Sequence, residues 1–275
     1  MSAKPSHAPL HLSIFSQVYL IDGKIVRKFP EESSYPDDPT IAILNEKVAY
    51  EHIGNHPRIA QWIPSDTDDY IDLEYYPNGN ILDYLNNYRD EIAPDLVARW
   101  GSQIIESIAV IHAKDIIHSD LNLKQVLLDD NLNARLSDFN ASACLGQPAL
   151  GYEKATHCLP RDQQDPNTVQ SDLFALGSTL YELAHGKGPY SELYPQPDTS
   201  IQPEDAQISY YKLREQADQK VEHLFSQKIF PDVSGSFCGC TIRGCWEERF
   251  TSAEEVLSSY KDEITKSGLG GDDHI

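Results

Sequence analysis

Two short motifs, whose aspartates lie eighteen positions apart, constrain this chain more than any other feature of its sequence. The first, at 117–128, runs Ile-His-Ser-Asp-Leu-Asn-Leu-Lys-Gln-Val-Leu-Leu, and the second, at 136–140, runs Leu-Ser-Asp-Phe-Asn. Each motif sets one aspartate, Asp120 or Asp138, in a short turn between apolar residues. A single turn of this kind also fits a solvated aspartate, because Asp favours turns through local hydrogen bonds. The pair indicates two carboxylates that rigid neighbouring segments hold in place.

The overall charge narrows the classes of partner. The chain carries 43 acidic and 22 basic side chains, for a formal net charge of -21. Such a charge repels phosphate backbones and anionic lipids, which disfavours nucleic-acid and membrane-surface binding and favours a basic protein partner or substrate. No apolar run approaches the roughly 18 residues needed to span a bilayer. The composition leaves the oligomeric state open.

The five cysteines are an odd number, and no secretory hydrophobic segment precedes them. They therefore predict reduced thiols in a cytoplasmic or otherwise intracellular protein. Cys238, Cys240 and Cys245 also raise the alternative of a zinc site, since thiolates at short spacing suit zinc. His223 is the nearest candidate for a fourth ligand, and we favour buried thiols over a metal site.

The N-terminal part of the chain has the pattern of a small sheet with one helix. Segments 17–21 and 24–29 alternate or carry β-branched residues and are joined at Asp22-Gly23, a strong hairpin signal. Segment 70–76 predicts a further strand, which breaks at Pro77. Between them, 41–53 predicts a helix, because apolar residues recur close to a 3.6 period. Its apolar positions are Ile41, Leu44, Val48 and Ala49.

Beyond residue 77 the pattern is mainly helical. The periodicity predicts helices at 81–88, 93–113, 171–186, 210–228 and 252–261. The two aspartate motifs lie between the second and third of these helices. No internal repeat or low-complexity block interrupts the chain.

The motifs resemble the catalytic core of protein kinases, and their style is similar to a divergent fungal group of serine/threonine protein-kinase-like proteins. In that family, the Asp of H-R-D-L-x-x-x-N orients the attacking hydroxyl, and the Asp of D-F-G holds magnesium. The resemblance assigns the first role to Asp120 and the second to Asp138. Segments 171–177 and 245–253 extend it, because they are similar to the start of a buried helix and to a segment near the end of the kinase fold.

The resemblance implies an α+β, two-lobed protein-kinase-like fold. A small antiparallel β N-lobe with one helix would occupy 10–76, and a mainly α-helical C-lobe would occupy 77–262. Residues 1–9 and 263–275 would form flexible tails.

The resemblance also implies a set of catalytic residues around Asp120. Lys28, near the end of the expected strand 24–29, would contact the α and β phosphates, and Glu46, chosen over Glu51, would fix its ammonium. Lys124 lies four positions after Asp120, where it would neutralise the γ-phosphate or else lie on the surface. Asp172 would be a structural hydrogen-bond acceptor beneath the catalytic loop.

ATP and magnesium are the implied cofactors. The adenine base would lie between Val18 and Val26 on one side and Leu127 on the other. The full set of residues implied to bind the nucleotide is Val18, Val26, Lys28, Glu74, Tyr76, Asn80, Leu127 and Asp138. Magnesium would be held by Asp138 and by Gln125, which replaces the family's Asn and adds a methylene that octahedral magnesium tolerates poorly.

The chain departs from the kinase pattern at the phosphate loop. His11, Ser13 and Ser16 stand where its glycines would be, so the backbone approaches the phosphates less closely and we expect weaker nucleotide affinity. The serine hydroxyls would substitute in part for the lost backbone contacts.

Other departures concern the catalytic loop and the end of the segment that follows it. Ser119 replaces the Arg of H-R-D, so no guanidinium is available for an activation-loop phosphate. Asn122 replaces the Lys typical of serine/threonine kinases. Arg161 stands where a Glu usually pairs with the Arg that matches Arg249, so Asp162 or another acid must take over, or the lobe is held differently.

The predicted function is transfer of a phosphoryl group from Mg-ATP to a protein hydroxyl, with Ser/Thr preferred and with reduced activity. A pseudokinase that acts as a binding or scaffold module is the alternative, favoured by the missing glycines. Retention of Lys28, Glu46, Asp120 and Asp138 favours the enzyme. A small-molecule kinase of the aminoglycoside or choline type is a third hypothesis, against which the segments 171–177 and 245–253 argue.

Overall fold

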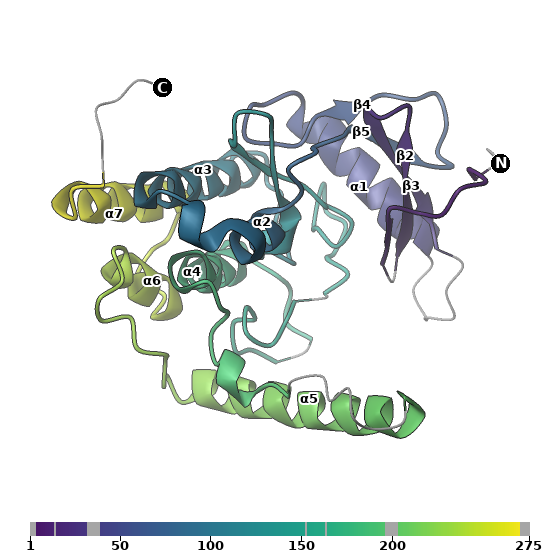
Figure 1. Ribbon diagram of the computed structural model, residues 1–275. Helices are drawn as coiled ribbons and strands as arrows, with labels where there is room; N and C mark the ends of the chain where they lie inside the picture. Colours follow the sequence, from purple (N-terminus) through teal and green to yellow (C-terminus); the bar gives the residue numbers. More distant parts are fainter. Residues whose placement is uncertain are drawn as a thin grey trace.

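The computed structural model describes residues 4–13, 15–31, 39–151, 153–162, 164–195 and 203–269. Figure 1 shows a sheet with one helix at one side of the molecule and a mainly helical part at the other. This arrangement confirms the predicted α+β fold with two lobes.

The N-lobe is built on an antiparallel sheet with strand order β1-β2-β3-β5-β4. Its strands are β1 (His11–Leu12), β2 (Ser16–Ile21), β3 (Ile25–Pro30), β4 (Trp62–Ile63) and β5 (Ile71–Glu74). The β2–β3 hairpin turns at Asp22 and Gly23, which both have positive φ values, of 50° and 68°. Because Asp-Gly tolerates that conformation, the hairpin forms where the sequence predicts it. The predicted strand 70–76 is shorter in the structure, at four residues.

Helix α1 (Pro39–Ile53) begins two residues before its predicted start. It is followed by Gly54, whose φ is +76°. Its buried face is not the predicted apolar stripe, since Ile41 is 54% exposed whereas Glu46 is fully buried. The face turned inward carries Ala42, Ile43, Glu46, Ala49 and Tyr50. This face combines apolar residues at a helical period with Glu46, which is paired to Lys28 on β3.

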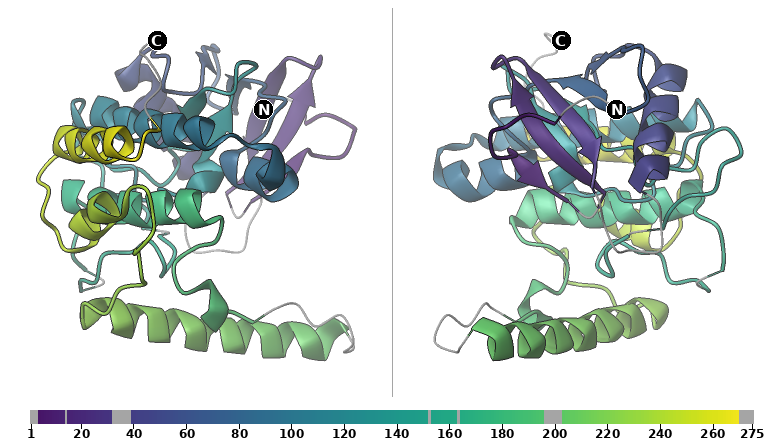
Figure 2. Two further views of the ribbon diagram at one scale, coloured as in Figure 1. Left: turned by 60° about the vertical axis from the view of Figure 1, so that its left-hand side comes forward. Right: turned by 90° about the vertical axis from the view of Figure 1, so that its right-hand side faces the viewer.

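The C-lobe surrounds α4 (Val169–His185), which is buried along almost its whole length. The other helices are α2 (Ile81–Tyr88), α3 (Pro94–His112), α5 (Pro203–Ser226), α6 (Gly239–Trp246) and α7 (Ala253–Lys266). A short hairpin of β6 (Val126–Leu128) and β7 (Ala134–Leu136) carries the two aspartate motifs at its ends. Both views in Figure 2 show α5 along one edge of the lobe.

Every helix predicted for the C-lobe is present, and most boundaries agree within two residues, but α5, α6 and α7 differ further from the prediction. Helix α5 begins seven residues before the predicted 210, and the short, glycine-containing α6 was not predicted. Helix α7 continues to Lys266, so the predicted tail 263–275 is wrong for its first residues. That last turn is ordered because Glu263 accepts hydrogen bonds from the backbone N–H of Cys240 and of Thr241, at 2.8 and 2.7 Å.

Within the described residues, no helix has both the length and the apolar content that a membrane crossing requires.

The contact between α4 and α6 depends on a glycine. A Cβ added at Gly177 would lie 2.7 Å from the Cβ of Cys245 and 3.2 Å from the carbonyl oxygen of Ile242. We expect Gly177→Ala to lower the free energy of unfolding by about 1–3 kcal/mol, because overpacking outweighs the gain of about 1 kcal/mol in helix propensity. Urea denaturation measures the change.

Ser258→Ala is the matched control, since Ser258 is exposed on α7 and gains helix propensity without a new contact. Its stability should equal or slightly exceed that of the wild type. If Gly177→Ala behaved in the same way, the close approach of α4 and α6 would be contradicted.

Candidate active site

One ammonium connects the two lobes. The Nζ of Lys28, on β3, lies 2.6 Å from Oε2 of Glu46 on α1 and 2.7 Å from Oδ1 of Asp138, which follows β7. Lys28 and Glu46 are buried, at 7% and 0% exposure. Glu51, the rejected alternative, is exposed on the same helix. The structure thus brings together three of the residues that the sequence places at the site.

The charges of this cluster are strongly coupled. Burial lowers the pKa of Lys28, but Asp138 and Glu46 reverse that effect and leave the pKa raised. Burial raises the pKa of Glu46 more than Lys28 lowers it. For Asp138, burial acts upward, and the Lys28 ammonium still holds its pKa below the usual value. Two carboxyl groups therefore share one ammonium.

The loop that carries Asp120 is fixed from below by α4. Asp172 accepts hydrogen bonds from the backbone N–H of His118 and of Ser119, at 2.7 and 3.0 Å. Ser119 and Asp138 both have a φ of 66°, a conformation that costs free energy in residues other than glycine. Asp172 occupies the place beneath the catalytic loop that the sequence predicts, and its two backbone contacts offset the strain at Ser119.

The Asp120 carboxylate is held by two amides of its own loop. Gln125 Nε2 donates to Oδ2 at 2.6 Å, and Asn122 Nδ2 contacts Oδ1 at 3.3 Å. Burial, followed by the charge of Asp138, raises the pKa of Asp120 to about 7. A carboxyl group with that pKa is suited to accept a proton near neutral pH.

A cavity of about 690 Å³ opens between the lobes. Such a volume suits a ligand of drug or nucleotide size. Its lining contains every residue predicted to bind nucleotide or metal, namely Val18, Val26, Lys28, Glu74, Tyr76, Asn80, Leu127, Asp138 and Gln125. Asp120 and Lys124 also line it, whereas Glu46 lies behind Lys28. The residues predicted for the site therefore lie together, in or next to one cavity.

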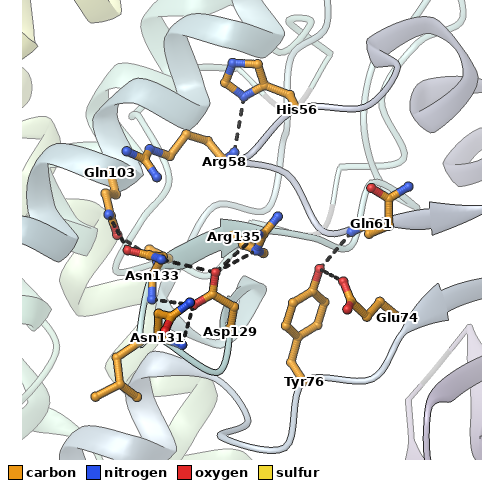
Figure 3. Close-up of polar contacts among 12 residues, drawn as sticks. His56, Arg58, Gln61, Glu74, Tyr76, Gln103, Asp129, Asn131, Asn133 and Arg135 are labelled. Carbon is orange, nitrogen blue, oxygen red and sulfur yellow. Dashed lines mark hydrogen bonds and ion pairs between the residues drawn. The ribbon is translucent and has the colours of Figure 1, made fainter. Parts of the chain in front are cut away.

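The segment that connects the lobes is held from behind, as Figure 3 shows. The Tyr76 hydroxyl accepts a hydrogen bond from the Gln61 backbone N–H at 2.9 Å and donates to Glu74 Oε2 at 3.1 Å. Below it, Asp129 accepts from the backbone N–H of Asn133 at 2.9 Å and pairs with Arg135 at 3.1 Å. The Tyr76 hydroxyl is thus committed to Gln61 and Glu74, and its contacts connect the segment to the strand side of the N-lobe.

Asn80 has a structural role that the sequence analysis missed. Its side chain caps α2, accepting from the Asp83 backbone N–H at 2.9 Å and donating to Asp83 Oδ2 at 2.8 Å. Asn at a helix N-cap is a common pattern, and the signal was present in the sequence before Ile81.

The turn between β1 and β2 is closed by its own serine. Ser13 Oγ accepts hydrogen bonds from the backbone N–H of Ser16 at 3.0 Å and of Phe15 at 3.3 Å. These donors are turned toward Ser13, and the Phe15 side chain lines the cavity. The Ser13 hydroxyl therefore stabilises the turn. From the sequence it was expected to replace a lost phosphate contact, and this structural role was missed.

Arg161 forms its ion pair with an acid upstream. Its guanidinium pairs with Glu153 in a largely buried contact, while Arg249 pairs with Glu247 at 3.1 Å on the surface. The acid that pairs with Arg249 is therefore Glu247 and not Asp162, and Arg161 is held separately by Glu153. The residue after Glu153, Lys154, also lines the cavity and was missed by the sequence analysis.

The donor set in the cavity suits magnesium better than zinc. Magnesium at phosphate-transfer sites uses one or two carboxylates together with phosphate oxygens. Asp138 supplies a carboxylate, and Gln125, with its nitrogen committed to Asp120, keeps its amide oxygen. In the part of the chain that the structure describes, no group of three or more His, Cys, Asp or Glu residues gathers as metal ligands. Cys238 and Cys245 are buried free thiols.

Comparison with known proteins gives one consistent result. The family described as protein kinase domain matches residues 18–260. A cell cycle serine/threonine-protein kinase of Saccharomyces cerevisiae is 31% identical over 171 residues, 58% of this chain and 24% of that protein. The maternal embryonic leucine zipper kinase of Danio rerio is 27% identical over 185 residues, 63% of this chain and 27% of that protein.

A third relative, mitogen-activated protein kinase kinase kinase 5 of Arabidopsis thaliana, is 27% identical over 180 residues, 59% of this chain and 25% of its own length. The match spans about a quarter of the length of each of these curated relatives.

The hydrogen bonds from Asp172 to the loop that carries Asp120 can be tested by removing the negative charge of Asp172. Asp172→Asn turns an amide donor toward a site that needs two acceptors, so one backbone N–H beneath Asp120 loses its partner. We expect the free energy of unfolding to fall by about 1–3 kcal/mol. Chemical denaturation measures this, and Asp130→Asn, at an exposed turn residue, should leave stability unchanged. Equal stability of the two variants would contradict the role of Asp172.

Proposed function

We propose that this chain, which belongs to the protein kinase family, transfers the γ-phosphoryl group of ATP to a serine or threonine hydroxyl of a protein. The observation that carries the proposal is the Lys28 ammonium, held between Glu46 and Asp138 at the wall of a cavity that Asp120 also lines. Phosphoryl transfer consists mainly of positioning and charge stabilisation, and these residues supply both.

Asp120 acts on the attacking hydroxyl. Its carboxylate accepts a hydrogen bond from the substrate hydroxyl and orients the hydroxyl oxygen toward the γ-phosphorus. A bond forms between that oxygen and the phosphorus as the bond to the β–γ bridging oxygen breaks. The products are the phosphorylated side chain and ADP, and the hydroxyl proton passes to Asp120 and then to solvent. The pKa of Asp120, about 7, suits this transfer.

The nucleotide is bound by apolar contacts and by the connecting segment. Val18 and Val26 face one side of the base and Leu127 the other, and all three line the cavity. Lys28 contacts the α and β phosphates. Asp138 and Gln125 would hold magnesium, which supplies charge neutralisation at the phosphate oxygens.

The proposed substrate is a basic intracellular protein. Serine/threonine specificity is supported by the printed name of the yeast relative. A second cavity of about 1220 Å³ is lined by Asp162, Asp165 and Glu222, whose charge suits a basic chain. An intracellular setting is supported by the five free cysteines.

A binding or scaffold module is the second candidate function. It is favoured by the Ser13 turn, in which the side-chain oxygen uses backbone N–H groups that phosphates would otherwise contact. For the same reason we propose that activity is lower than in kinases with a glycine-rich loop.

Nucleotide binding is the first test of the proposal. Thermal unfolding is measured with ATP alone and with ATP plus magnesium or manganese. At about 100 times the dissociation constant, we expect stabilisation of about 2.7 kcal/mol and a rise in Tm of about 5–10 °C. Asp138→Asn should abolish the metal-dependent part, and Asp130→Asn should retain it. No shift at millimolar nucleotide would overturn the proposal and favour the scaffold module.

Catalysis is tested separately from binding. Asp120→Asn removes the proton acceptor but leaves the cavity walls in place, so it should reduce phosphate transfer at least about 100-fold. Transfer from radiolabelled ATP to histone and to the chain itself measures the loss, while MgATP affinity should change little. Transfer by the wild type that Asp120→Asn leaves intact would contradict the assigned role, and MgATP binding without any transfer would favour the scaffold module.

A further inference from the structure

Lys154 occupies the junction of two cavities. It lines the cavity of about 690 Å³ that contains Asp120 and Asp138. It also lines a neighbouring cavity of about 570 Å³, whose other walls include Tyr194 and Arg214. The two cavities share Lys154, so a nucleotide in the first and a protein chain in the second would both contact this residue. Lys154 stands where the nucleotide and such a chain would meet.

The surroundings of Lys154 place its ammonium among acidic groups. Burial lowers the pKa of Lys154, and the carboxylates of Glu182 and Asp120 act in the opposite direction. The charges of Lys124 and Arg214 act with burial. The effect is mutual, because Lys154 lowers the pKa of both Asp120 and Glu182. Burial prevails, so the pKa of Lys154 stays below its ordinary value. The half-buried Lys154 thus shares one cavity with the carboxylate assigned to the attacking hydroxyl.

The catalytic loop itself has no buried cation close to Asp120. Asn122 stands two positions after it, and its Nδ2 is bound to the Asp120 carbonyl oxygen at 2.9 Å. Lys124 lines the cavity but is exposed. Developing charge in phosphoryl transfer is spread over three equatorial oxygens and is best stabilised by fixed, desolvated donors. Lys154 fits that requirement better than Lys124 does.

The segment around Lys154 is anchored on both sides. Its carbonyl oxygen accepts a hydrogen bond from the His157 backbone N–H at 2.7 Å. The preceding residue, Glu153, forms the largely buried ion pair with Arg161. The backbone of Lys154 is therefore held by contacts that do not use its own ammonium, which stays available to a ligand.

We propose that Lys154 is a catalytic residue that contacts the γ-phosphate of ATP beside Asp120. It supplies, from the segment after Asp138, the positive charge that the catalytic loop lacks at Asn122. This inference rests on the proposed function. It also means that the phosphate site is complete only when segment 153–161 is in place.

The test compares two nucleotides that differ by the γ-phosphate. Affinities for MgATP and MgADP are measured by titration calorimetry on the wild type and on Lys154→Met. A charged hydrogen bond to the γ-phosphate predicts a loss of at least about tenfold for MgATP and less than about twofold for MgADP. Lys154→Arg, which keeps the charge, should retain part of the preference for MgATP.

Lys212→Met is the matched control, because Lys212 is exposed on α5 and does not line these cavities. Lys154→Gln serves as a second neutral variant if Lys154→Met does not fold. Equal losses for both nucleotides, or no loss for either, would overturn the role of Lys154 while leaving the proposed function intact. Failure of the wild type to bind MgATP would instead overturn the proposed function and this inference with it.

Discussion

The arrangement of the two lobes depends on the ammonium of Lys28, because it pairs with one carboxylate from each side of the cleft. Glu46 comes from the helix of the N-lobe and Asp138 from the motif that follows the C-lobe hairpin. Burying Lys28 and Glu46 is costly unless each charge is paired, and the half-buried Asp138 completes the contact only when β3, α1 and the segment after β7 are all in place. It also accounts for the burial of the charged Glu46 on α1, while the apolar Ile41 of the same helix is exposed.

The elements around this contact differ in how far the sequence predicts them. Segments with regular periodicity, such as the β2–β3 hairpin and α3, appear close to their predicted bounds because local residue pattern determines them. Helix α6 was missed because eight residues with two glycines show no period. The rotation of α1 was not predicted because the helix has two faces with helical apolar spacing, and only the structure shows that the face with Ile43 and Tyr50 is the buried one.

The residues of the candidate site also differ in how far the sequence predicts them. Asp120, Asp138 and Lys28 stand in recognisable local motifs, so the sequence was sufficient to select them. Glu153 and Lys154 lie in a segment without periodicity, and the charged neighbours of Lys154 come from residues far along the chain. Only the path of that segment brings Lys154 to the wall of the cavity. Sequence spacing is not sufficient to assign residues of this kind to the site, and the tertiary structure is needed.

The departures from the kinase pattern have a common physical consequence. In the catalytic loop, Asn122 and Gln125 hold the Asp120 carboxyl group through amides, so the loop fixes its geometry without contributing a buried positive charge. Ser119 likewise brings no guanidinium that a phosphate could pair with. Segment 153–161, which carries Lys154, is anchored instead by the Glu153–Arg161 ion pair, which is already complete in the unmodified chain. Since the anchor needs no added phosphate, the position of Lys154 depends on the stability of that ion pair.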